Sequence, residues 1–259
     1  MHNPLINMFA SLVLFTGPTF SPVPVTPVLE PGFLRSHSDM VIGRPEDKLQ
    51  DLLDQCTTSA DIEKLANSFD AVAKLYEQEL DHRNAEVCYL VAIRLMNMCL
   101  PKNSPKLAVE YERLAVHYSH VDQGELARIA NLKALKIYKA NGREFAVEQA
   151  VIEHNQAWLE LYAGKNSAAE YYLKHCLVLL KSVLGSEHPL VGLVSSSLGE
   201  LYMYNGNFQA AEKLLKNALE ILPENSDMEE VNRYVRTNYN LVLERLGKHG
   251  EKVVHGQIK

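Results

Sequence analysis

The sequence lacks the short motifs that accompany common catalytic centres. It contains no GxSxG, HExxH, GxxxxGKS/T or GxGxxG segment. These are the patterns expected of a serine hydrolase, a zinc protease, a P-loop and a dinucleotide-binding turn. The adjacent serines at 195–197 have no histidine and aspartate at interpretable positions. We therefore predict a protein that is not an enzyme and has no catalytic residues.

Metal-binding patterns are also missing. The cysteines form no CxxC pair and have no histidine at zinc-ligand spacing, so most should be buried thiols: Cys56, Cys88, Cys99 and Cys176. Their even number leaves disulfides open if the chain is exported. His117 and His120 lie three residues apart, but no cysteine or carboxylate pattern completes a site. We expect no metal and no cofactor.

A surplus of positive charge is absent, since 26 Lys and Arg face 32 Asp and Glu for a net charge of -6. Nucleic-acid binding needs a clustered basic surface, so the charge balance argues against that function class. A basic protein segment or a neutral peptide suits the sequence better as a partner.

No apolar run is long enough to cross a bilayer, which takes about 20 residues. The run LINMFASLVLF at Leu5–Phe15 has the length of a signal-peptide core, but no Lys or Arg precedes it and no A-x-A site follows. Five prolines between 18 and 31 predict an extended tether. Residues 1–43 are thus a separate segment. Export or membrane association through residues 1–20 and a cytoplasmic location both stay open.

Small residues recur every 42 positions in the rest of the sequence. One alanine column is followed seven residues later by a second small column, and a third lies twelve residues before the first. The columns are Ala85, Ala127, Ala169 and Ala211; Ala92, Ala134, Cys176 and Ala218; and Ala73, Ala115, Ala157 and Gly199. Small side chains at helical spacing let helix backbones approach closely, and four copies predict a stacked array.

The array is predicted to be all-α, a solenoid of antiparallel helix pairs over residues 44–247 with a tail at 248–259. The expected pairs are 60–80 with 83–98, 106–120 with 123–139, 146–163 with 166–184, and 189–204 with 207–222. A short helix ending near Cys56 and a helix at 228–246 should cap the two ends. Ser59 is the expected N-cap of the first repeat helix, and Pro105 and Pro189 should open two others.

The fourth repeat resembles the tetratricopeptide repeat. The residues that fall where that family places its L-G-x-x-Y, G-x-Y/F, A, A and P residues are Leu198, Gly199, Tyr202, Gly206, Phe208, Ala211, Ala218 and Pro223. The 42-residue spacing and the G-S-E-H-P turn at 185–189 are similar to the longer repeats of kinesin light chains. The resemblance covers about residues 59–246. It implies a right-handed superhelix of four repeats and a capping helix.

The third repeat departs from this pattern. Strict 42-residue register would bury Glu153, Gln156 and Glu160, which is costly without partners. A two-residue shift of the first helix would place these three outside and Trp158 and Tyr162 inside. It would also shorten the turn before Ala169 by two residues. The shifted register is therefore our prediction.

The resemblance also implies a groove lined by the first helix of each pair. Carried over by position, the candidate partner-binding residues are Asp70, Lys74, Glu77, Glu112, Val116, His120, Gln156, Glu160, Ser196, Glu200 and Tyr204. Together with Glu153, the set holds six carboxylates and one lysine. It predicts an acidic groove for a basic or hydrogen-bond-donating segment. The alternative is a solvated acidic helix face without a ligand.

The sequence as a whole predicts a protein–protein adaptor or scaffold. The alternative is a self-association module that forms homo-oligomers through the capping helix or the N-terminal tail.

Overall fold

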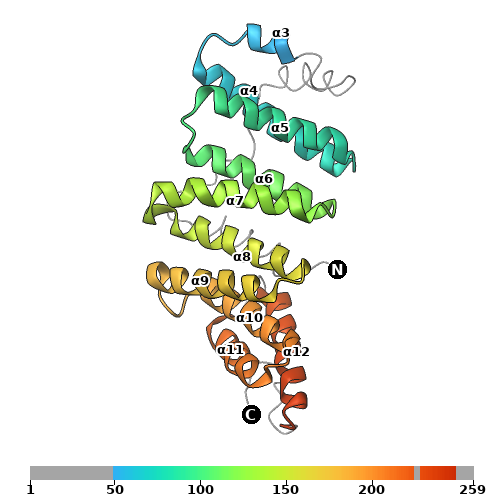
Figure 1. The fold of residues 1–259 in the computed structure, drawn as a ribbon, viewed down its shortest axis with the longest axis vertical. Coiled ribbons are helices and arrows are strands. Elements are labelled where there is room, and N and C mark those ends of the chain that lie inside the picture. The colour runs from blue at the N-terminus through green and yellow to red at the C-terminus, as the bar shows by residue number, and fades with distance from the viewer. Residues whose placement is uncertain (1–48, 225–227, 249–259) are drawn as a thin grey trace. The chain divides into compact units, whose positions relative to one another are not determined.

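The computed structural model describes residues 49–224 and 228–248 (Figure 1). Every regular element in these ranges is helical. The elements are α3 (Leu49–Asp54), α4 (Ser59–Gln78), α5 (His82–Cys99), α6 (Pro105–His120), α7 (Gly124–Asn141), the 3-10 turn η1 (Arg143–Phe145), α8 (Ala146–Tyr162), α9 (Asn166–Leu184), α10 (Pro189–Tyr204), α11 (Phe208–Ile221) and α12 (Glu229–Arg245). The predicted all-α architecture is confirmed. The predictions for residues 1–43 and 249–259 lie outside the described residues.

The chain divides into two compact units, and the division falls between residues 143 and 144. In the first unit α4 packs on α5, α5 on α6 and α6 on α7; in the second, α8, α9, α10, α11 and α12 pack in the same consecutive way. Each unit is thus a stack of helix pairs. Among the described residues, no helix has the length and apolar character needed to cross a membrane.

The small-residue columns lie where helices cross. Ala85, Ala127, Ala169 and Ala211 are all buried, as are Ala92, Ala134, Cys176 and Ala218. Gly199 shows why a column needs small side chains: a Cβ there would lie 2.9 Å from Cγ of Leu215 on α11. The columns therefore set the approach of α10 to α11 and of the equivalent pairs.

A hydrogen bond of the same kind links successive pairs in each unit. In the first unit the Tyr118 hydroxyl on α6 donates to Glu86 of α5 at 2.8 Å. In the second the Tyr202 hydroxyl on α10 donates to Glu170 of α9 at 2.8 Å. Tyr202 and Glu170 each lie two periods of 42 residues after their counterparts Tyr118 and Glu86. The repeat therefore fixes polar contacts as well as packing.

The turns within the four pairs show that the third repeat keeps strict register. Each turn has three residues, and its middle residue has a positive φ at a spacing of 42: Leu80 (60°), Asp122 (60°), Gly164 (73°) and Gly206 (73°). The predicted two-residue shift, with its shortened turn, is therefore wrong. Ala157 is buried in the same column as Ala73, Ala115 and Gly199.

Burial in the third repeat corrects the same prediction. Glu153, Gln156 and Glu160 are buried, and Tyr162 is 61% exposed, whereas Trp158 lies in the core as expected. The polar groups tolerate burial because they have partners. Glu153 pairs with His175 at 2.5 Å, and Gln156 donates to Glu160 at 2.8 Å. The predicted shift assumed buried polar groups without such partners.

The start of α4 needs a smaller correction. Thr58, not Ser59, is the N-cap, and its hydroxyl accepts from the Asp61 amide while the Asp61 carboxylate accepts from the Thr58 amide. This reciprocal pair is a capping box, which satisfies two helix-end donors at once. Pro105 and Pro189 open α6 and α10 as predicted.

Enlarging a small column should destabilise the fold. Ala127 on α7 is fully buried, so we expect Ala127→Leu to overpack the crossing and lower the free energy of unfolding by about 1–3 kcal/mol. Ala140→Leu, at an exposed site on the same helix, is the matched control and should change stability little. Urea denaturation followed by circular dichroism measures both. Equal stabilities would mean that the column does not set the packing.

The positive φ values predict a stabilising substitution. Leu80 adopts φ 60° where the third and fourth repeats have glycine, and its side chain is exposed. A left-handed conformation costs a residue such as leucine roughly 1–2 kcal/mol, and the entropy lost by glycine offsets part of the gain. Leu80→Gly should therefore raise the unfolding free energy by up to about 1 kcal/mol. Asp122→Gly should gain less, because aspartate tolerates this region. Urea denaturation of both variants measures the effect, and a destabilised Leu80→Gly variant would contradict the prediction.

Candidate protein-binding surface

The predicted groove residues lie on the first helix of each pair, α4 and α6 in the first unit and α8 and α10 in the second. We call these surfaces the first-helix face of each unit. The structure buries Asp70, Gln156, Glu160, Ser196 and Glu200, half-buries Lys74, Glu77 and Glu112, and exposes Val116, His120 and Tyr204. The carboxylates of this set are thus buried or half-buried instead of exposed, and binding of a partner to the set stays a prediction.

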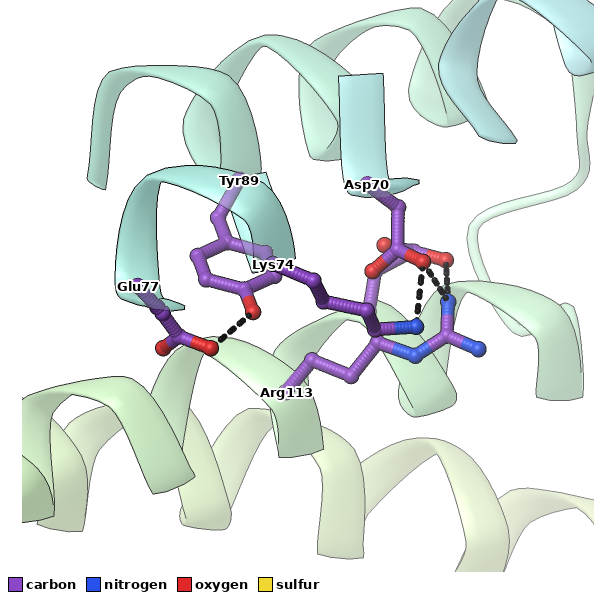
Figure 2. Close-up of polar contacts among 6 residues, drawn as sticks. Asp70, Lys74, Glu77, Tyr89 and Arg113 are labelled. Carbon is purple, nitrogen blue, oxygen red and sulfur yellow. Dashed lines mark hydrogen bonds and ion pairs between the residues drawn. The ribbon is translucent and has the colours of Figure 1, made fainter. Parts of the chain in front are cut away.

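In the first unit, two buried carboxylates are covered by two half-exposed cations (Figure 2). Asp70 accepts from Lys74 at 2.8 Å and pairs with Nη1 of Arg113 at 3.2 Å. The same Nη1 of Arg113 donates to Glu110 at 2.6 Å. The first-helix face of this unit thus presents the ammonium and guanidinium groups, which lie above Asp70 and Glu110.

Glu110 and Arg113 were not among the predicted site residues. The sequence held a signal for Glu110, which falls in the column that has Ser68, Ile152 and Val194 in the other repeats. A charged residue in a column whose other members carry no charge needs a partner. Burial raises the pKa of Glu110 to about 7; Arg113 and Lys74 oppose this shift, and Asp70 adds to it.

Two further carboxylates of the first unit are held by aromatic donors. The hydroxyl of Tyr89 donates to Glu77 at 3.0 Å (Figure 2), and the buried His117 ring lies 2.9 Å from the other Glu77 oxygen. Burial opposes ionisation of Glu77, but the His117 and Tyr89 contacts outweigh it and lower its pKa. Tyr138 donates to Glu112 in the same manner. These carboxylates therefore fix side chains of the face in place.

In the second unit, a buried carboxylate lies near two exposed tyrosines. Glu200 on α10 accepts from the hydroxyl of Tyr234 on α12 at 2.6 Å. Tyr162 and Tyr204 occupy equivalent positions at the ends of α8 and α10 and are 61% and 69% exposed. Partial burial of each ring and the nearby Glu200 charge raise the pKa of both phenols. Negative potential from Glu200 therefore reaches two exposed side chains.

A histidine and a serine of the second unit meet in the core, where solvent does not reach them. His154 Nε2 lies 2.9 Å from the Ser197 hydroxyl, and both residues are completely buried. Burial lowers the pKa of His154 to about 3, so the ring is neutral. Among the described residues, no group of three or more histidine, cysteine or carboxylate side chains could hold a metal ion. Cys88 and Cys176 are buried thiols, whereas Cys56 and Cys99, which were also expected among the buried ones, are half-buried.

Comparison with known proteins agrees with this geometry. A family model described as the tetratricopeptide repeat matches residues 154–190 and 195–222. These two segments, which lie in the third and fourth repeats, resemble the tetratricopeptide repeat. In fold, the chain's helical repeats are similar to the TPR-like repeats of a putative kinesin light chain. Such repeats generally mediate protein–protein interactions, and their fold is typically a non-enzymatic scaffold.

Solved structures share the helical-repeat fold. BtubC (BKLC) from P. vanneervenii is 25% identical with a TM-score of 0.67, and the match covers 83% of this chain and 84% of that one. A putative kinesin light chain from Podosopora anserina with nearly identical TPR-like repeats is 19% identical with a TM-score of 0.60, covering 74% and 90%. The latter likeness shows the fold alone. None of the curated proteins matches the sequence.

The Glu110 cluster predicts a pH-dependent stability. Because the folded-state pKa of about 7 exceeds the ordinary 4.5, folding holds a proton that the unfolded chain releases. The stability contributed by this group is present below pH 4.5 and is lost as pH rises through 7. Glu110→Gln removes that loss, so the stability of the variant relative to wild type should increase as pH rises from 4.5 through 7. Urea denaturation across this range tests it; a constant difference would show that Glu110 stays ionised throughout.

Proposed function

We propose that the chain is an adaptor that binds a segment of another protein on its first-helix faces, and that the second unit prefers a basic segment. The exposed pair Tyr162 and Tyr204 beside the Glu200 carboxylate is the observation that carries this proposal. Both rings offer a flat apolar surface with a hydroxyl at its edge. An arginine or lysine side chain can lie over such rings and is attracted by the carboxylate.

Preordered side chains favour binding at this surface. Tyr162 rests against the buried Trp158, with ring centroids 6.3 Å apart. Glu200 is held by Tyr234, so its charge does not move when a partner docks. A tyrosine also loses little side-chain entropy on binding, because it has only two side-chain torsions. Rigid helix pairs therefore present the surface at a small ordering cost.

The first unit contributes differently to the proposed interaction. Its face carries Lys74 and Arg113 above Asp70 and Glu110, and Val116 and His120 are exposed on the same helix, α6, as Arg113. A segment bound here contacts cationic donors paired with carboxylates, and not a surface of negative potential. The preference for basic residues is accordingly assigned to the second unit.

Self-association through α12 is the weaker candidate. The exposed residues of α12 are mostly charged or polar, and Leu241 is the large apolar exception. Homodimer interfaces usually bury a more apolar surface. The proposed adaptor function therefore takes precedence.

A capture experiment tests the adaptor proposal with the full chain as bait. Lysine substitutions at Glu160 or Glu200 are unsuitable because both residues are buried and bonded. The double variant Tyr162→Ala, Tyr204→Ala removes only exposed side chains. We expect it to lose a partner that wild type retains, and we expect binding to weaken when salt rises from about 0.1 M to about 1 M, where charges are screened within about 3 Å.

The matched control changes the same repeat position in the first unit. Gln78→Ala with His120→Ala also alters exposed side chains and should keep the salt-sensitive partner. Captures that are equal for all three proteins, or a partner whose binding ignores salt, would overturn the proposed basic preference.

A further inference from the structure

The outer face of α9 carries an exposed apolar pair away from the first-helix faces. Tyr171 is 63% exposed and Val178 is 68% exposed. The two residues are seven apart, so they lie on one side of the helix two turns from each other. An isolated exposed apolar residue needs no explanation, but a pair at this spacing forms a stripe.

The other repeats do not carry an uncharged pair at the same positions. The equivalent residues are Val87 and Arg94 in the first repeat, Ile129 and Lys136 in the second, and Lys213 and Glu220 in the fourth. The second position of the pair is therefore charged in each of those repeats, and in the fourth both positions are charged. The third repeat replaces that charged residue with Val178, so its apolar surface extends over two turns of the helix.

The aromatic end of the stripe is held in place by its neighbours. The Tyr171 ring stacks on His175 with centroids 6.2 Å apart and an interplanar angle of 23°. His175 Nδ1 in turn contacts the buried Glu153 carboxylate at 2.5 Å. Tyr172 meets Tyr171 edge-on at 5.5 Å. A ring fixed in this way keeps its exposed face available at little entropic cost.

Positive charge flanks the stripe. Lys174 and Lys181 each follow an apolar residue of the stripe by three positions, and both are exposed. Lys174 pairs with Glu170 at 2.6 Å. Lys181 makes no ion pair with any residue in the ranges that the structure describes. A partner therefore meets apolar contacts bordered by cations.

We propose that the outer face of α9 docks an acidic amphipathic helix of a partner protein. Its apolar side chains would lie against Tyr171 and Val178, and its carboxylates would face Lys174 and Lys181. A second copy of α9 fits poorly, because it would bring lysines against lysines. The chain's own apolar run at Leu5–Phe15 contains no carboxylate. Charge complementarity thus selects an acidic partner.

A displayed library of helical peptides tests this docking surface. The library is selected on the full chain and depleted on the variant Tyr171→Lys, Val178→Glu, which gives the third repeat the pair found in the fourth. We expect enriched peptides to carry apolar residues seven apart with flanking carboxylates. A synthetic peptide of that sequence should bind wild type saturably and the variant at least about tenfold more weakly.

Matched controls test whether this surface itself is responsible for the binding. Ile129→Lys with Lys136→Glu places the same charged pair on α7 and should leave the affinity unchanged, as should Tyr171→Phe, which keeps the ring. The Tyr162→Ala, Tyr204→Ala variant should also bind the peptide normally, so the result does not depend on the proposed adaptor site.

Three results would overturn the proposal. They are the absence of enrichment, enrichment of peptides without carboxylates, and equal affinity of the peptide for wild type and the Tyr171→Lys, Val178→Glu variant. Vesicles of phosphatidylcholine with phosphatidylserine provide the remaining comparison. Sedimentation of the chain with these vesicles, lost in the same variant and without peptide binding, would assign the face to an anionic lipid surface instead.

Discussion

Close approach of helix backbones is the constraint on which the other features of this protein depend. Small residues at a 42-residue spacing let the second helix of each pair cross the first and the following pair. At Gly199 even a methyl group would lie within 2.9 Å of Leu215. Because the spacing is fixed, residues 42 positions apart occupy equivalent sites in successive repeats. Each set of equivalent sites can therefore serve one purpose, such as packing or polar contact.

One role is to keep carboxylates inside the packing. Asp70 and Glu110 share Arg113, Glu77 lies between Tyr89 and His117, and Glu200 accepts from Tyr234. A buried carboxylate is costly unless donors replace its water. These contacts supply a donor to at least one oxygen of each carboxylate, and they fix the position of charges near the surface. Electrostatic complementarity can then act without rearrangement of the scaffold.

The sequence predicted the architecture closely because spacing alone determines it. Helix bounds and the proline starts of α6 and α10 followed from periodic small residues and helix-end signals. The core position of Trp158 was predicted correctly, but from the shifted register, which is wrong. The register of the third repeat was missed for a definable reason. Glu153 is stabilised by His175, which lies on the next helix. The expectation that each buried polar residue is costly by itself does not account for His175, the hydrogen-bond partner of Glu153, which lies 22 positions away in the sequence.

The same limitation explains why the charge of the groove was only partly visible in the sequence. Counting only the predicted groove positions, Glu153 included, gives six carboxylates and one lysine, yet the solvent meets Lys74 and Arg113 above Asp70 and Glu110. Charge at a binding face depends on which member of an ion pair lies outermost, and long cationic side chains reach the surface more readily than short acidic ones. In the second unit Glu200 is bonded by a tyrosine hydroxyl, and exposed tyrosines lie beside it. The two faces of one repeated scaffold therefore differ in the chemistry that they offer, although their helices follow the same register.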